Sequence, residues 1–160
     1  MRRAAEQAGF TFVGILIAVA VFGVGLAGLA QLWSLNAQRE REQELLFVGE
    51  QYRVAILSFA AATPPGKPRY PRELRELLDD RRHVVARRHL RQLYPDPLTG
   101  RVDWEAVLAP DGGIVAVHSR HAGTPIKVGN FPAQYASFER ATSYRDWVFG
   151  APPPRERAGR

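Results

Sequence analysis

The sequence predicts an α+β fold in which a long N-terminal helix, transmembrane in its first part and amphipathic in its second, packs on a small antiparallel sheet. Residues 10–33 carry no charged side chain. The first proline of the chain is Pro64, so one helix can continue from the apolar segment to residue 63. Two apolar stretches, at 102–108 and 114–119, flank a turn sequence that contains proline and glycine. This order is typical of a β-hairpin.

Residues 10–33 are long enough to cross a bilayer. As a helix with about 1.5 Å of rise per residue, the segment would measure roughly 36 Å, against a hydrocarbon thickness of about 30 Å. The positive-inside rule favours neither orientation strongly, because arginines precede the segment at positions 2 and 3 and follow it at positions 39 and 41. Glycines at 23, 25 and 28 would allow another helix to approach closely.

The junction at Gly9 is the most informative feature of the sequence. Residues 1–9 are short and polar and end in a glycine, which is followed directly by Phe10-Thr11-Phe12-Val13. This junction resembles the prepilin leader of type IV pilins and of the pseudopilins of type II secretion. The resemblance implies that a prepilin peptidase cuts after Gly9 on the cytoplasmic side of the inner membrane, and that Phe10 becomes the N-methylated first residue. A cut at this position leaves the apolar segment in place as an anchor.

Two other interpretations of the N-terminal segment stay open. Residues 10–33 can form an uncleaved anchor, or they can belong to a secretory signal cut after Ala30, although such a signal would have an unusually long apolar region. The orientation with the leader in the cytoplasm and the C-terminal domain in the periplasm follows from the resemblance. It implies a single-pass inner-membrane protein that is incorporated into a periplasmic filament.

Gly14 departs from the pattern of the family. Most of its members carry a glutamate five residues into the mature chain, where the carboxylate can pair with the free amino terminus of a neighbouring subunit. An unpaired carboxylate or amine in an apolar environment is costly. Either glycine is the better residue for lipid or helix contact here, or this subunit docks differently. In the second case it occupies a tip or minor position, or receives the acid from another subunit.

Residues 34–63 are expected to continue the helix as an amphipathic segment. Apolar residues recur at spacings of three and four and predict one buried stripe, while Phe47 and Val54 fall on nearly the opposite face. The stripe suits a sheet packed on the helix, and the second face suits contacts with other subunits or burial within the same domain. The stripe consists of Leu45, Val48, Tyr52, Ala55, Ile56 and Phe59.

Residues 64–150 are expected to form a small α+β periplasmic domain. A short helix is predicted at 70–78, strands at 102–108 and 114–119, and a third strand at 125–128. Tyr135 and Phe138 lie at helical spacing, and three further aromatic residues close to the end suggest core positions. The Tyr70-Pro71 segment and the turn at 94–100 before Trp104 are similar to features of type II secretion pseudopilins. The aromatic residues are Tyr144, Trp147 and Phe149, and residues 151–160 are predicted to be a disordered tail.

We find no sequence pattern for an enzyme, a cofactor or a metal. The chain has no cysteine, no nucleophile elbow and no phosphate-binding loop. His118 and His121 have a spacing that can bind metal, but no acidic cluster accompanies them. The calcium loop of major pseudopilins is rich in aspartate, whereas residues 123–141 contain none. The resemblance is therefore to a minor or divergent pseudopilin.

The expected function is that of a structural subunit of a type II secretion or type IV pilus-like filament. Its implied partners are the prepilin peptidase, other pilins or pseudopilins and the inner-membrane assembly platform. One alternative is a minor pilin for DNA uptake that uses Arg87, Arg88 and Arg91. We consider nucleic-acid binding the weaker interpretation, because no aromatic residues alternate with these arginines. An exposed basic helix over residues 81–91 is the preferred explanation of the basic stretch. A signal-anchored periplasmic protein is a further alternative.

Overall fold

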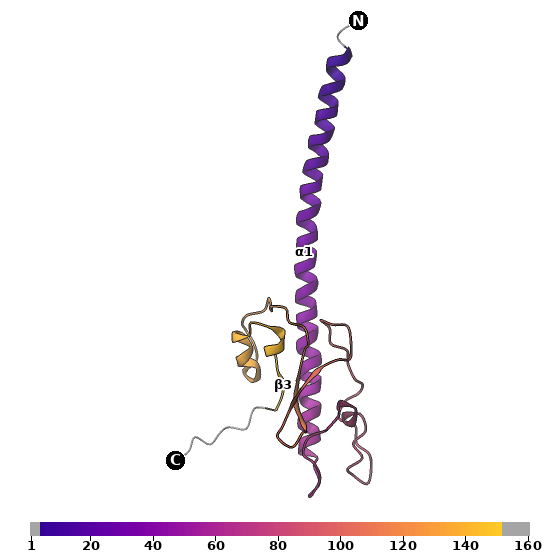
Figure 1. Ribbon diagram of the computed structural model, residues 1–160, viewed down its shortest axis with the longest axis vertical. Coiled ribbons are helices and arrows are strands. Elements are labelled where there is room, and N and C mark those ends of the chain that lie inside the picture. Colours follow the sequence, from indigo (N-terminus) through magenta and orange to yellow (C-terminus); the bar gives the residue numbers. More distant parts are fainter. Residues whose placement is uncertain (1–3, 152–160) are drawn as a thin grey trace, which may run out of the picture. The chain divides into compact units, whose positions relative to one another are not determined.

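The computed structural model describes residues 4–151, and within the first helix it describes no side chains at 4–11 and 23–32. The helix α1 spans Ala4–Ala61, a continuous run of 58 residues (Figure 1). The chain divides into two compact units, Met1–Arg39 and Glu40–Arg160. The second part of α1 therefore belongs to the same unit as the rest of the domain.

The predicted membrane segment at 10–33 lies partly outside the described residues. Among the helical residues that are described, no stretch is both long enough and apolar enough to span a membrane. Those at 12–22 expose apolar side chains on every side of α1. The predicted tail lies outside the described residues apart from Ala151.

The amphipathic pattern of α1 is confirmed in the second unit. All six residues of the predicted stripe are at most 4% exposed. On the opposite face Phe47 is 62% exposed and Val54 is 49% exposed. The periodicity of the sequence thus predicted correctly which face of the helix supports the domain.

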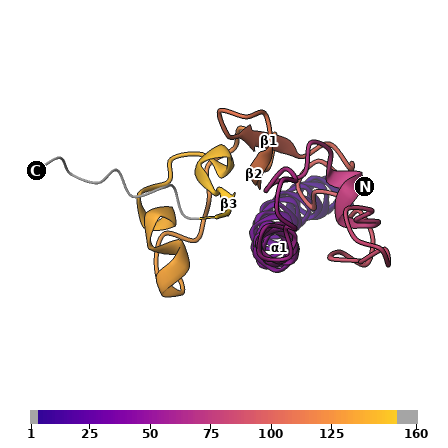
Figure 2. The same ribbon diagram turned by 90° about the horizontal axis from the view of Figure 1, so that it is seen from below.

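A three-stranded antiparallel sheet packs against this stripe, so the fold is α+β. The strands are β1 (Glu105–Leu108), β2 (Ile114–His118) and β3 (Phe149–Gly150), in the order β1-β2-β3. The predicted hairpin is confirmed: β1 pairs with β2 through Glu105 and His118, with a register shift at Val107/Leu108. Viewed along α1, all three strands lie on one side of the helix (Figure 2).

The predicted strand at 125–128 is wrong, and β3 at 149–150 takes the third place in the sheet. The backbone N–H groups of Ile126 and Lys127 donate to the buried carboxylate of Glu42 on α1. These two donors are therefore used by a side chain rather than by a neighbouring strand. Pattern recognition along the chain cannot detect such a competitor 84 residues away.

The remaining elements are three short 3₁₀ helices: η1 (Leu74–Leu77), η2 (Ala133–Arg140) and η3 (Tyr144–Asp146). The helix predicted at 70–78 is shorter than expected, because the Pro71 carbonyl accepts a hydrogen bond from Ile114 of β2 and that part of the chain stays extended. The Asp-Pro turn precedes β1, with Asp96 fully buried. Its carboxylate accepts hydrogen bonds from the backbone of Leu98 and from Ser119.

The exposed basic helix expected around residues 81–91 is also wrong. Asp80 and Arg87 form an isolated antiparallel bridge, with N···O distances of 2.8 and 3.1 Å, and the residues between them form a loop. The carboxylate of Asp80 accepts from the backbone N–H of Arg82 at 3.0 Å. An aspartate that binds its own backbone two residues ahead favours a turn over a helix.

Aromatic residues fill the space between α1, the sheet and η2. The rings of Phe138 and Trp147 are stacked with centroids 5.5 Å apart, and Phe149 meets Phe138 edge to face at 5.4 Å. The three aromatic residues that the sequence placed in the core near the end of the chain are at most 1% exposed. The prediction of their burial is confirmed.

Gly49 of α1 lies directly beneath the ring of Phe149, where an added Cβ atom would come within 2.5 Å of three ring carbons. We expect Gly49→Ala to lower the free energy of unfolding by about 1–3 kcal/mol, although alanine normally strengthens a helix. Urea denaturation of the protein in detergent measures this loss. A second substitution, Phe149→Leu, should recover part of it in the Gly49→Ala background.

Gly129→Ala is the matched control, because an added Cβ atom there meets no other atom within 4 Å. Its free energy of unfolding should stay within about 0.5 kcal/mol of the original protein. Equal losses at Gly49 and Gly129 would contradict the packing argument.

Candidate functional site

The predicted processing residues belong to the N-terminal unit. The backbone of Gly9 and Phe10 is part of α1, and their side-chain surroundings lie outside the described residues. Gly14 is described, and a Cβ atom added to it would meet no atom within 4 Å outside its own helix backbone. The isolated chain therefore has room for a larger side chain at this position.

The apolar side chains that follow Gly14 are exposed. Phe12, Ile17 and Phe22 are 64%, 60% and 74% exposed. Successive residues of a helix point in directions about 100° apart, so the exposed residues at 12–22 surround the whole helix. A helix that is apolar on every side requires a partner of the same character, either lipid or other helices.

A polar cluster around the buried Asp80 closes the C-terminal end of α1, and we call its members the Asp80 cluster. They are Ser58, Asp80, Arg82 and His89, of which Ser58 is exposed. The Asp80 carboxylate is fully buried and accepts two bonds from the Arg82 guanidinium, each 2.8 Å long. The same guanidinium donates to the Phe59 carbonyl at 2.7 Å and lies over the Phe59 ring, 3.4 Å from its centroid. Arg82 thus occupies a carbonyl that the last turn of the helix leaves unpaired.

The Arg82 guanidinium holds the pKa of Asp80 well below its ordinary range, against the opposing effect of burial. A charge-assisted bidentate pair explains the direction, since the ionised carboxylate is the form that accepts both bonds. The cluster joins residues 80–89 to the end of α1, and it fixes the loop between them to the helix.

Ser58, His89 and Asp80 follow one another like a nucleophile, a base and an orienting acid. Ser58 Oγ lies 2.8 Å from His89 Nδ1, and His89 Nε2 lies 3.2 Å from Asp80 Oδ2. Nucleophilic catalysis also needs space for a substrate and donors for the oxyanion. Neither of the two hollows described below is lined by Ser58 or His89, and Arg82 already neutralises Asp80. These bonds join residues 80 and 89 to Ser58 of α1.

A second buried carboxylate, Glu42, organises the other end of the domain. It is 2% exposed and accepts bonds from Lys127 N at 3.1 Å and from Tyr144 Oη at 2.7 Å, besides that from Ile126 N. Two turns further along α1, Glu50 accepts from Tyr135 and from Arg53. The Arg53 guanidinium lowers the pKa of Glu50, and burial raises the pKa of Tyr135.

The arginines considered for nucleic-acid binding lie on one exposed loop and the segment after it. Arg87, Arg88 and Arg91 are exposed, and the Nε atom of Arg88 is 3.4 Å from the Leu78 carbonyl. The loop also presents Val84 and Val85, 107% and 76% exposed. The sequence identified the arginines, but the expected helix concealed that two exposed valines lie just before Arg87.

The two histidines with metal-binding spacing make other contacts. His118 Nδ1 lies 2.9 Å from the Ser119 carbonyl, and His121 Nδ1 accepts from Gly123 N at 3.0 Å. The His121 ring packs edge to face on Tyr144. Within the part of the chain that the structure describes, no group of three or more histidine, cysteine, aspartate or glutamate side chains could hold a metal ion.

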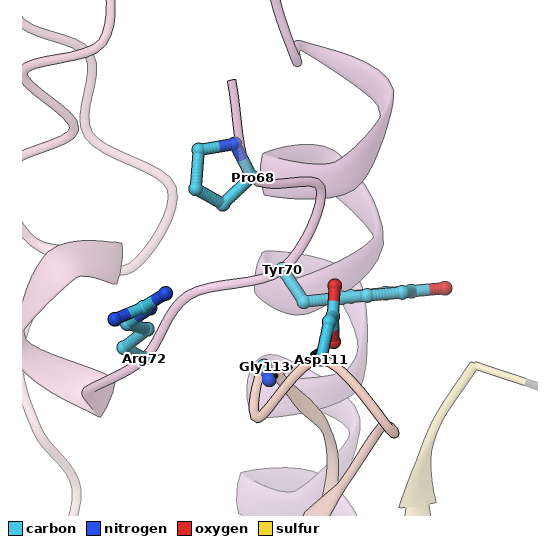
Figure 3. A pocket seen from close by; sticks show the side chains of 5 residues that line it. All are labelled: Pro68, Tyr70, Arg72, Asp111 and Gly113. Carbon is cyan, nitrogen blue, oxygen red and sulfur yellow. Dashed lines mark hydrogen bonds between the residues drawn. The ribbon is translucent and has the colours of Figure 1, made fainter. Parts of the chain in front are cut away.

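Two hollows lie near the hairpin. A small one of about 170 Å³ is lined by Pro68, Tyr70, Arg72, Asp111 and Gly113, and none of these side chains bonds to another across it (Figure 3). A wider groove of about 850 Å³ runs along the outer face of the sheet and is lined chiefly by apolar residues, including Val107, Leu108, Val115 and Val148. The polar residues of its lining are Arg69, Tyr70 and Asp111.

The chain matches no protein-family model, no curated protein and no solved structure.

The Asp80 cluster predicts how stability depends on pH. The pKa of Asp80 is lower in the folded protein than in the unfolded chain, where it is about 3.9. The ion pair therefore stabilises the fold fully when the pH is above this unfolded pKa, and this stabilisation is lost as the pH falls below it. We expect Arg82→Gln to reduce the free energy of unfolding by about 3 kcal/mol at pH 7. The difference from the original protein should narrow between about pH 4 and pH 2.

Denaturation curves at several pH values test this, with Arg81→Gln as the control. Arg81 pairs with Asp79 at 2.6 Å, but its side chain is 84% exposed. Arg81→Gln should therefore lower the free energy of unfolding by less than about 1 kcal/mol at any pH. If the difference in free energy of unfolding between Arg82→Gln and the original protein stayed constant down to pH 2, Arg82 would not be the partner that stabilises ionised Asp80. His83 and His89 face Asp80 in both proteins, so the comparison isolates Arg82.

Glu42→Gln should also weaken the domain. The amide group of the glutamine would turn its own hydrogens toward the backbone N–H groups that now donate to the two carboxylate oxygens. We therefore expect the free energy of unfolding to fall by about 1–3 kcal/mol. Hydrogen exchange should increase at Ile126 and Lys127 before it increases in β1 and β2. Glu44→Gln, exposed and two residues away on the same helix, is the control and should change neither quantity.

Proposed function

We propose that this chain is a membrane-anchored structural subunit of a pilin-like filament, of the type II secretion or type IV pilus class, and that it is not an enzyme. The observation that carries the proposal is the junction Gly9–Phe10 at the start of an uncharged segment that belongs to one unbroken helix. The second part of that helix supports a small antiparallel sheet. A helix that serves both as an anchor and as the central support of a domain suits a fibre built by helix packing.

The exposed apolar residues at 12–22 support the membrane part of this proposal. A soluble protein seldom exposes a continuous apolar surface around a whole helix. In a bilayer the same surface is solvated by lipid, and in a filament it packs against other helices. The proposed route begins in the inner membrane, continues with cleavage after Gly9 and methylation of Phe10, and ends with insertion into the filament.

Cleavage is tested by the N-terminal sequence and the mass of the protein purified from membranes with and without a prepilin peptidase. We expect the mature chain to begin at methylated Phe10 only when the peptidase is present. A Gly9→Leu variant should keep Met1 in both samples. An intact Met1 in the presence of the peptidase would overturn the proposal in favour of a plain anchor, and a chain that begins after Ala30 would indicate a secretory signal.

Gly14 points to an unusual place in the filament. The proposal is that this subunit does not need the carboxylate through which most family members meet a neighbour, as at a tip or minor position. The open space around Gly14 means that a glutamate can be accommodated in the isolated chain. Its carboxylate would then be available to pair with the amino terminus of another subunit.

Gly14→Glu should therefore make the protein polymerise more readily in a filament-assembly assay, with a several-fold rise in the sedimentable fraction. Gly14→Gln is the matched control, because it has nearly the same shape without the charge and should leave assembly unchanged. An unchanged sedimentable fraction for Gly14→Glu would count against a special position. Equal gains for both variants would show that volume, rather than charge, limits assembly.

A further inference from the structure

Two exposed surfaces of the second unit combine apolar and charged residues of opposite sign. The first, which we call the basic loop, comprises residues 81–88 and presents Val84, Val85, Arg87 and Arg88. The second, which we call the outer stripe, is the exposed face of α1 formed by Glu40, Glu44, Phe47 and Val54. All eight of these residues are exposed.

The outer stripe is a single surface with an unfavourable charge distribution. Its residues are separated by four, three and seven positions, so they lie on one side of the helix. Glu40 and Glu44 are one turn apart, and like charges at this spacing repel. Arg41 lies within a turn of Glu44, but neither glutamate forms an ion pair among the described residues. A cation from another molecule would relieve the repulsion.

The basic loop carries cations and apolar side chains in a fixed position. The backbone bridge between Asp80 and Arg87 closes its base, and Arg82 joins it to the Phe59 carbonyl of α1. Neither Arg87 nor Arg88 forms an ion pair with any of the described residues. Arg81, by contrast, is neutralised by Asp79. The loop therefore offers two arginines without an ion-pair partner among the described residues, beside two exposed valines.

We propose that the basic loop of one copy binds the outer stripe of a second copy, with Val84 and Val85 against Phe47 and Val54 and with Arg87 and Arg88 beside Glu40 and Glu44. The inference rests on the filament function proposed above, and it names the surfaces by which the subunits meet. Charge and apolar character are complementary between the two surfaces. Each surface alone would leave its apolar residues in water and its charges unpaired.

The arrangement favours an open chain of copies over a closed pair. The loop lies at the level of Phe59, whereas the centre of the stripe, at Phe47, lies twelve residues earlier on the same helix. With about 1.5 Å of rise per residue, two parallel copies would be staggered by about 18 Å. Different patches meet in such a contact, so it is heterologous and can repeat indefinitely. The contact is small, and it would act together with packing between N-terminal helices.

Cross-linking in membranes tests the contact directly, because the chain has no cysteine of its own. We expect Phe47→Cys and Val85→Cys chains, produced together, to form a disulfide-linked dimer that neither variant forms alone. A single chain with both substitutions should form a ladder of larger products. Phe47→Cys with Val102→Cys is the matched control pair, since Val102 is also exposed, at 53%, but lies outside both surfaces. This control pair should give only the background yield of disulfide-linked dimer.

Charge reversal tests the complementarity. Glu44→Arg or Arg87→Glu alone should lower the cross-linked yield by about three- to tenfold, and the two together should restore it. The control combination of Glu44→Arg with Arg101→Glu should not restore the cross-linked yield. A Val85→Cys chain that links to itself as well as to Phe47→Cys would overturn the inference, as would a double reversal that restores nothing. Competition by duplex DNA without charge-swap rescue would assign the arginines to nucleic acid and also overturn it.

The two proposals can fail separately. Chains that begin at Phe10 and enter filaments but give no cross-link would contradict the contact and leave the filament function standing. Chains that keep Met1 yet form the ladder would contradict the filament function. The contact would then stand as a self-association surface of a protein with a different role.

Discussion

The domain depends on polar contacts that join its loops to α1. Its three strands are short and its other helices are single 3₁₀ turns or little more, so the segments between them have few backbone partners of their own. Glu42 provides such partners for residues 126–127, and Arg82 joins the loop after η1 to the last turn of the helix. Tyr52 adds a third contact by donating to the Tyr94 carbonyl. Since each is buried or partly buried, breaking one leaves an unsatisfied polar group as well as a lost bond.

The same helix carries the apolar side of the core. Its buried stripe faces the hairpin and the aromatic residues near the end of the chain, and Gly49 allows Phe149 to lie against the backbone. One face of α1 therefore organises the domain. The opposite face remains exposed and carries Phe47 and Val54, which no other described part of the chain covers. A helix used on one side for folding leaves its other side available for assembly.

The buried carboxylates of the domain all accept hydrogen bonds from within the chain. Asp80 binds the Arg82 guanidinium, Glu42 binds Tyr144 and two backbone N–H groups, and Asp96 binds Ser119 and the backbone of Leu98. Even the sequence of bonds from Ser58 through His89 to Asp80 ends on a carboxylate that Arg82 holds. The two exposed valines and the arginines beside them lie instead on the surface of the domain.

By itself, the sequence determined the long helix, its buried stripe, the hairpin and the burial of Trp147 and Phe149, because these depend on periodicity and turn chemistry that operate within a few residues. The Gly9–Phe10 junction and Gly14 were also visible in the sequence alone. Only the tertiary structure decided that Phe149–Gly150 completes the sheet, that Ile126 and Lys127 bind Glu42, and that residues 81–88 form a loop. The first two outcomes depend on a partner distant along the chain, and the loop combines the local bond from Arg82 N to Asp80 with the distant bond from Arg82 to the Phe59 carbonyl. Local patterns contain no information about which distant group will supply that partner.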